Sequence, residues 1–168
     1  SMNSTQNIKD AAGNFAEIPG RDASGTTISS ILVRSSTGTS GTVEVDATAP
    51  AAFTVGTVVA DGGTVVATKW NSTNTGIKVD VPIASDNSLV GVPGGVQIQA
   101  KIGANSFADI GSIQTIVSGD LGTDKEITVA EAAVEAITGY AEGATMVFTA
   151  IIRDQAGNTT TGTQSGDT

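Results

Sequence analysis

The chain has 168 residues, a net charge of −9, no histidine and no cysteine. This length allows one domain or slightly more, and the acidic balance repels phosphate groups, which argues against nucleic-acid binding through a basic surface. The missing residue types exclude histidine acid–base catalysis, cysteine nucleophiles, disulfides and the usual zinc sites. Abundant Thr, Val and Gly, with only 4% aromatic residues, favour an all-β chain with many turns. No apolar run approaches the roughly 20 residues of a membrane-spanning helix, so we expect no membrane insertion.

The first 45 residues are predicted to be separate from the rest of the chain. Short strands are expected over residues 28–34 and 42–45, on either side of a Ser/Thr/Gly-rich turn at 35–41. Ser1 and Met2 look like a tag remnant followed by an introduced start, so we expect a fragment of a longer protein. Residues 1–45 are interpreted as the tail of a preceding unit with a joining segment, and residues 46–168 as one domain.

Most of the second part is predicted to be β-strand. Apolar residues alternate with polar residues along two segments, 77–83 and 95–103, which places one face of each strand inward. The other expected strands are residues 53–60, 64–70, 110–117 and 145–153. Short strands with turn signals every 8–12 residues are typical of a β-sandwich.

One segment is predicted to be helical. Thr128 followed by Glu131 has the spacing of a capping box, residues 132–138 are good helix formers, and Gly139 is a natural helix end. We therefore expect one short helix against a sheet of the sandwich.

A short sequence recurs near the two ends of the chain. Residues 8–14 read Ile-Lys-Asp-Ala-Ala-Gly-Asn, and residues 152–158 read Ile-Arg-Asp-Gln-Ala-Gly-Asn. Thr, Gly and Ser follow both copies. This recurrence predicts that the chain holds about one period of a tandem array.

Several motifs resemble those of bacterial immunoglobulin-like tandem repeats. Residues 45–50, Val-Asp-Ala-Thr-Ala-Pro, are similar to the junction that opens such repeats, and residues 154–158, Asp-Gln-Ala-Gly-Asn, resemble the motif that closes them. The resemblance covers roughly residues 45–160, including residues 70–76. It implies an immunoglobulin-like β-sandwich in a large secreted or cell-surface protein of bacteria, often an adhesin, with neighbouring repeats of the same protein as partners. The spacing is longer than in compact members, and no second opening junction follows Asn158. We therefore expect either that the last strand is truncated, or that the N-terminal segment supplies a strand to the sheet, within one chain or between chains.

Calcium is the cofactor that the junction motifs suggest. The resemblance implies one site from Asp10, Asn14 and Asp46, and half of the next site from Asp154 and Asn158. Calcium takes six to eight oxygen ligands, which these side chains could provide in part. The alternative is a tight turn in which Asp caps the backbone, Gly takes a positive φ and Asn tolerates the left-handed region. Asp80, Asp86 and Asn87 are a second candidate oxygen cluster, with a solvated loop as the alternative.

Catalysis is not expected. A glycosidase needs two acids about 5–10 Å apart in an aromatic-lined groove, whereas the acids are scattered and the chain has one Trp, one Tyr and four Phe. Gly-x-Ser-x-Gly and phosphate-loop motifs are also missing from the sequence.

The expected function is a non-catalytic spacer or stalk repeat, located outside the cell or on a bacterial cell surface. One alternative is a glycan- or protein-binding module that uses loops at one end of the sandwich, which exposure of Trp70 or Tyr140 would favour. Packing of Trp70 under a sheet edge is the competing interpretation. Another alternative is an assembly subunit completed by strand exchange, which an exposed apolar edge beside residues 146–152 would favour.

Overall fold

The computed structural model describes residues 7–9, 15–17, 31–34, 40–43 and 45–165. The chain forms two compact units, Ser1–Asp46 and Ala47–Thr168. In the first unit, β1 (Asn7–Lys9) pairs antiparallel with β2 (Phe15–Glu17), and β3 (Ile31–Arg34) pairs antiparallel with β4 (Ser40–Val43). The strands predicted at 28–34 and 42–45 are therefore found in part, as β3 and β4, among the described residues.

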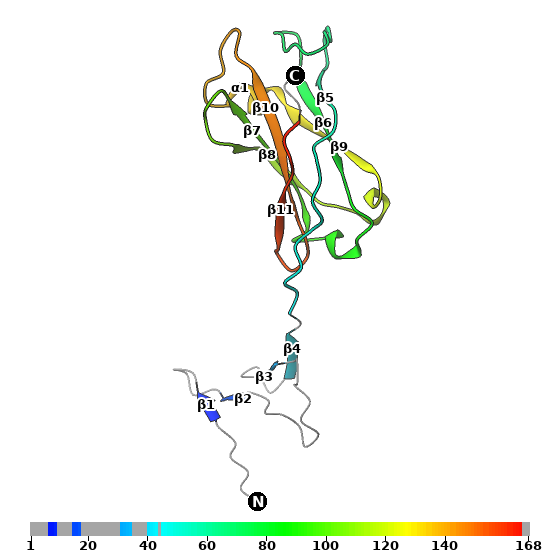
Figure 1. Ribbon diagram of the computed structural model, residues 1–168, viewed down its shortest axis with the longest axis vertical. Coiled ribbons are helices and arrows are strands. Elements are labelled where there is room, and N and C mark those ends of the chain that lie inside the picture. The colour runs from blue at the N-terminus through cyan, green and yellow to red at the C-terminus, as the bar shows by residue number, and fades with distance from the viewer. Residues whose placement is uncertain (1–6, 10–14, 18–30, 35–39, 44, 166–168) are drawn as a thin grey trace, which may run out of the picture. The chain divides into compact units, whose positions relative to one another are not determined.

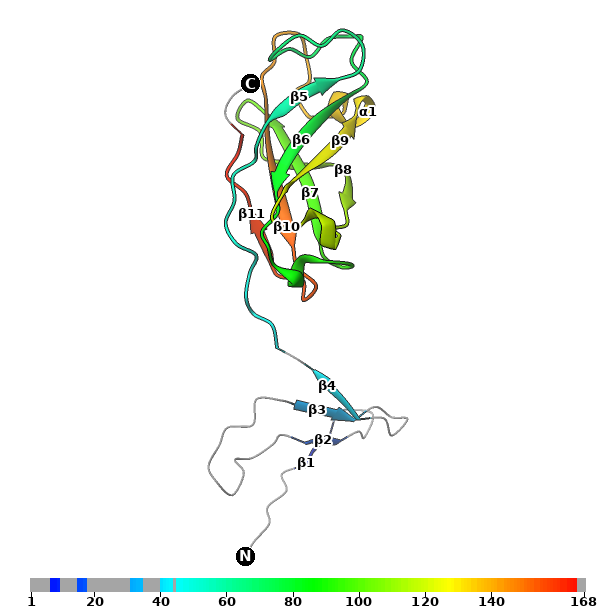
Figure 2. The same ribbon diagram turned by 90° about the vertical axis from the view of Figure 1, so that its right-hand side faces the viewer.

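The second unit is a β-sandwich of two antiparallel sheets (Figure 1, Figure 2). The three-stranded sheet contains β5 (Val58–Asp61), β6 (Gly76–Pro82) and β9 (Asp124–Ala130) in that order. The four-stranded sheet has the order β11 (Thr159–Thr161), β10 (Met146–Arg153), β7 (Gly95–Ile102) and β8 (Ala108–Gln114). The expectation of an all-β sandwich with one short helix is confirmed.

The hydrophobic core lies between the two sheets and follows the predicted alternation. Alternate side chains of β6 and β7 are buried. In β10, which pairs with β7 along its whole length, residues 147–150 are buried on both faces of the strand. The inward residues of these three strands are Ile77, Val79, Val81, Val96, Ile98, Ala100, Ile102, Phe148, Ala150 and Ile152. Each large side chain buried in this way contributes about 1.5–3 kcal/mol to folding. This core holds the ends of the strands, and the loops between them, in place.

The predicted helix at 128–138 is mostly wrong. Thr128 lies in β9, opposite Lys78 of β6, and the helix α1 covers only Glu131–Glu135. The capping box does not form, because Ala130 occupies the N-cap position and makes no side-chain hydrogen bond. Burial of Ile127 and Val129 at period two outweighs the local helix signal, since both side chains pack in the sandwich core. Among the described residues, no helix is long and apolar enough to cross a membrane.

The strand predicted at 64–70 is also wrong. After the turn at Gly62 and Gly63, the segment bends back on itself through a single bridge between Val66 and Lys69, with Thr68 at φ 58°. No neighbouring strand pairs with it among the described residues. Residues 62–75 therefore form a long loop beyond the end of β5.

The beginning and the end of the sandwich run side by side in parallel. Thr54 and Thr163 form a parallel bridge, Val55 N–H donates to the Thr163 carbonyl at 3.0 Å, and Thr163 N–H donates to the Phe53 carbonyl at 2.9 Å. The strand predicted at 53–60 is thus split, since residues 53–55 pair with residue 163 and only Val58–Asp61 form β5. A three-residue strand, β11, follows Asn158 and pairs with β10. On the edge away from β7, β11 pairs with β10 at Ile151–Arg153, and the backbone N–H groups of Gly162 and Ser165 donate to the carbonyls of Ala150 and Phe148. Strand exchange with another copy stays a prediction.

Candidate functional site

The Asp-Gln-Ala-Gly-Asn motif is the turn that joins β10 to β11. The Asp154 carboxylate is fully buried and accepts hydrogen bonds from the Asn158 backbone N–H at 2.8 Å and from Asn158 Nδ2 at 2.9 Å. Gly157 takes φ +94°, as predicted, whereas Asn158 does not enter the left-handed region. Burial alone would raise the pKa of Asp154, but hydrogen bonds from Asn158, Gly157 and Ala156 outweigh it and lower that pKa below its ordinary value. The turn therefore holds a buried, ionised carboxylate.

This turn also holds the segment that leads into the sandwich. Asn158 Nδ2 donates to the Thr48 carbonyl at 3.3 Å, and two residues further along, the Thr160 hydroxyl donates to the Pro50 carbonyl at 2.5 Å. On another side, Gln155 donates from its backbone N–H to the Ser88 carbonyl at 2.8 Å. We call this set of contacts the turn clamp: Asp154, Asn158 and Thr160 holding Thr48 and Pro50.

Of the five predicted calcium ligands, the structure shows Asp154 and Asn158 in contact with each other. Asp10 and Asn14 lie outside those residues, and Asp46 belongs to the first unit. Both carboxylate oxygens of Asp154 accept hydrogen bonds from Asn158, so a cation would have to displace donors that are already in place. In the part of the chain that the structure describes, no group of three or more acidic side chains could hold an ion. The described geometry fits a self-contained turn, and calcium at the junction stays a prediction.

The second predicted oxygen cluster is a capped loop. Asp86 accepts a hydrogen bond from the Ser88 backbone N–H at 2.9 Å and caps a short 3-10 helix, Asn87–Leu89. Asp80 lies in β6, where its backbone bonds to Thr57 and Gly56. Asp80, Asp86 and Asn87 therefore have separate local roles.

A hollow with a volume of about 530 Å³ opens at the other end of the sandwich. Its walls are the 62–75 loop and β5 on one side and the 136–146 segment on the other, and its floor includes the core residues Ile77, Ile102 and Phe148. Three valines of its lining are partly exposed: Val59 (45%), Val65 (55%) and Val66 (48%). The hollow thus connects the surface to the apolar interior between the sheets.

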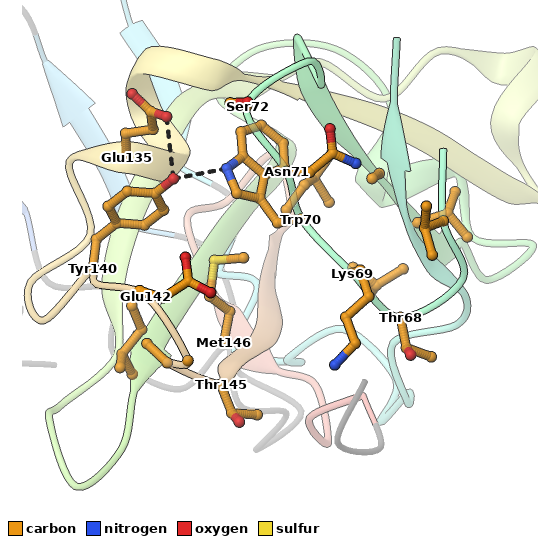
Figure 3. A pocket seen from close by; sticks show the side chains of 18 of the residues that line it. Thr68, Lys69, Trp70, Asn71, Ser72, Glu135, Tyr140, Glu142, Thr145 and Met146 are labelled. Atoms are coloured by element: carbon orange, nitrogen blue, oxygen red, sulfur yellow. Dashed lines mark hydrogen bonds between the residues drawn. The ribbon is translucent and has the colours of Figure 1, made fainter. Parts of the chain in front are cut away.

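The only tryptophan and the only tyrosine of the chain meet in this hollow. Trp70 Nε1 donates to the Tyr140 hydroxyl at 2.8 Å, and that hydroxyl donates to Glu135 Oε1 at 3.1 Å (Figure 3). Trp70 is half-buried and packs against the core, while Tyr140 is 39% exposed. Desolvation raises the pKa of Tyr140, the Glu135 and Glu131 carboxylates raise it further and the Trp70 bond opposes them, so the phenol stays protonated and acts as a donor. Trp70 thus packs partly against the core, as the packing interpretation predicts. Its indole N–H, however, donates to the Tyr140 hydroxyl, and its side chain borders the hollow.

Charged and polar side chains surround the aromatic pair. Lys69 lies on the wall made by the 62–75 loop, and Glu142, Thr145 and Met146 lie on the opposite wall (Figure 3). Trp70 and Tyr140 were recognised from the sequence only as single candidates. Their pairing has no local signal, because 70 positions separate them.

Comparison with protein-family models, with curated protein sequences and with solved structures finds no match to this chain.

Proposed function

We propose that this chain is a non-catalytic spacer module from a tandem array, within a large secreted or cell-surface, adhesin-like protein of bacteria. The observation that supports it most is the parallel pairing of the first and last segments of the sandwich. Because these segments run in the same direction, the chain enters the sandwich at one end and leaves it at the opposite end (Figure 1, Figure 2). Modules with this geometry extend a head-to-tail array along its axis.

The turn clamp fits the same function. It fixes Thr48 and Pro50 against the end of β10 and the start of β11, at the end where the chain enters. The φ of Pro50 is also restricted by its ring, and its side chain is buried. A segment held at two points transmits orientation from the preceding part of an array to the sandwich.

The direction of the terminal segments determines how the sandwich would bear load. A force along the array pulls the entering segment and the β11 end in opposite directions along their shared ladder, so several hydrogen bonds must break together. The ladder includes the contacts of residues 48–55 with residues 158–163. A spacer on a cell surface needs this resistance, because it has to stay folded while it connects two objects.

The bacterial surface location and the immunoglobulin-like identity of the sandwich rest on the resemblance of residues 45–50 and 154–158. Calcium at the junction, through Asp10, Asn14, Asp46, Asp154 and Asn158, belongs to the same proposal. The absence of His and Cys from the sequence supports a non-catalytic role.

Force spectroscopy on the whole chain, held by its two ends, tests the spacer function. We expect the sandwich to unfold in one event that lengthens the chain by the extended length of its roughly 120 residues, about 400–430 Å at 3.3–3.6 Å each, less the span of the folded sandwich. Thr160→Val removes the hydroxyl that donates to Pro50 and should lower the unfolding force. Thr159→Val is the matched control, since Thr159 is exposed and adjacent on the same strand, and it should leave the force unchanged. Gradual extension at low force, or equal forces for both variants, would contradict the load-bearing role of the ladder.

A further inference from the structure

The hollow around Trp70 and Tyr140 has features that the spacer function does not require. A spacer has no need of a cavity at its end, yet three partly exposed valines and the Trp70–Tyr140 pair line a hollow with a volume of about 530 Å³. This volume lies within the range of about 300–1,000 Å³ found for small-molecule sites. The lining is apolar at the floor and polar at the rim, which is also the usual pattern of such sites.

The aromatic pair is fixed before any ligand arrives. The Trp70 to Tyr140 bond and the Tyr140 to Glu135 bond connect the 62–75 loop to the segment after α1. Fixed rings lose little conformational entropy on binding, and they present electron-rich faces. The C–H face of a sugar ring is apolar and slightly electropositive, so it packs well on such an aromatic face.

The charges of the rim select among possible ligands. Glu135 and Glu142 offer acceptors, whereas Lys69 offers three donors from its ammonium group. A simple organic cation would use the carboxylates but would be repelled by Lys69. A simple anion would be repelled by both carboxylates and by the net charge of −9. Sugar hydroxyls both donate and accept, so a neutral sugar satisfies all three side chains at once.

We propose that this hollow is a carbohydrate-binding site for a short neutral oligosaccharide, with one sugar ring against Trp70 and Tyr140 and its hydroxyls bonded to Lys69, Glu135 and Glu142. The Thr145 hydroxyl, on the wall opposite Lys69, adds a group that can donate or accept. This activity goes beyond the spacer function and does not depend on it, because the hollow is built by loops other than the turn clamp.

The single tryptophan gives a direct assay. Because all indole fluorescence of the chain comes from Trp70, we expect a sugar ring that packs against Trp70 to change that emission. We would titrate the full chain with cellotetraose, maltotetraose, laminaritetraose and mannotetraose, and separately with choline chloride. The proposal expects a saturable change with at least one tetrasaccharide and a Kd below about 1 mM. No saturable change with any tetrasaccharide would overturn it, and a response to choline alone would replace it with a cation site.

Variants on the rim place the binding in the hollow. Tyr140→Ala removes a partly exposed ring and Glu142→Gln removes a surface charge, so both variants should fold, which their melting curves would verify. By calorimetry, we expect Tyr140→Ala to weaken binding of the responding tetrasaccharide at least tenfold and Glu142→Gln to weaken it several-fold. Asp124→Asn, an exposed acid at the far end of β9, is the charge control and should bind as the parent does. Unchanged affinity in folded Tyr140→Ala would refute the site.

Discussion

Asp154→Ala should destabilise the sandwich strongly, because the carboxylate is buried and holds the turn clamp together. It accepts two hydrogen bonds from Asn158, at 2.8 and 2.9 Å. Hydrogen bonds to charged groups contribute about 1.5–3 kcal/mol each. The neighbours Gln155, Ala156 and Gly157 are exposed, so water can reach part of the opened turn, and the lower value applies. The two Asn158 bonds at that value already predict a loss of about 3 kcal/mol in the free energy of unfolding, and the bonds from Gly157 and Ala156 act in the same direction.

Urea denaturation at pH 7, followed by Trp70 fluorescence, measures this loss for the second unit alone, since Trp70 is the only tryptophan. Asp86→Ala is the matched control: Asp86 also accepts from a backbone N–H in a turn, at 2.9 Å, but it is exposed. Loss of such an exposed cap should cost about 0.5–1 kcal/mol. If Asp154→Ala costs no more than Asp86→Ala, the buried carboxylate does not support the turn, and the explanation given for its low pKa is wrong.

Three further outcomes are expected. If the predicted junction site binds Ca²⁺, a hundredfold excess over Kd should stabilise the fold by about 2.7 kcal/mol and raise the melting temperature. EDTA should reverse this rise, and Asp46→Ala should abolish it. Superimposable melting curves with and without Ca²⁺ would contradict the calcium prediction. Folding lowers the pKa of Asp154, and it lowers the pKa of Asp120 because that carboxylate accepts hydrogen bonds from Lys125 Nζ at 2.7 Å and from the Val117 N–H at 2.9 Å. Both groups therefore stabilise the fold above their ordinary value of 3.8, and the stability measured by urea titration should fall as the pH drops below 3.8 through the lower folded pKa values. A flat profile between pH 5 and pH 2 would contradict both assignments. Gly63→Ala should destabilise the sandwich by about 1–3 kcal/mol, because Gly63 has φ +57° and a Cβ there would lie 2.0 Å from the Thr73 carbonyl oxygen. An unchanged melting temperature would show that the 62–75 loop rearranges freely.

The sequence predicts the strands whose alternation is reinforced by the core. β6, β7 and β10 are found close to their expected bounds, since their apolar residues alternate over seven or eight positions and every inward residue meets another strand. β9 was missed for a physical reason. Thr128 and Glu131 have helix-start spacing, but pairing of the whole segment with β6 buries Ile127 and Val129, which a short exposed helix would not.

The two candidate sites differ in how much of them a sequence can show. The Asp154–Asn158 turn is local, so its residue types predict its geometry, including the positive φ of Gly157. The hydrogen bond from Asn158 to Thr48 depends on pairing between the first and last segments of the sandwich, so no local sequence pattern predicts it. The hollow is wholly non-local. The sequence around Trp70 and the sequence around Tyr140 do not predict that the two side chains meet. Only the sandwich fold brings their two loops together.

The turn clamp and the hollow lie at opposite ends of the sandwich, and β10 links them. Met146, at the start of β10, borders the hollow, and Arg153, at its end, precedes the turn clamp. Eight residues at about 3.4 Å each separate the two regions by roughly 25 Å. At that distance, with no shared partners, the effects of changes on stability should add to within about 0.5 kcal/mol. The loss of unfolding free energy in the Asp154→Ala, Tyr140→Ala double variant should therefore equal the sum of the losses in the two single variants. The double variant should bind the oligosaccharide as weakly as Tyr140→Ala does. A larger coupling would mean that β10 transmits the state of one end of the sandwich to the other.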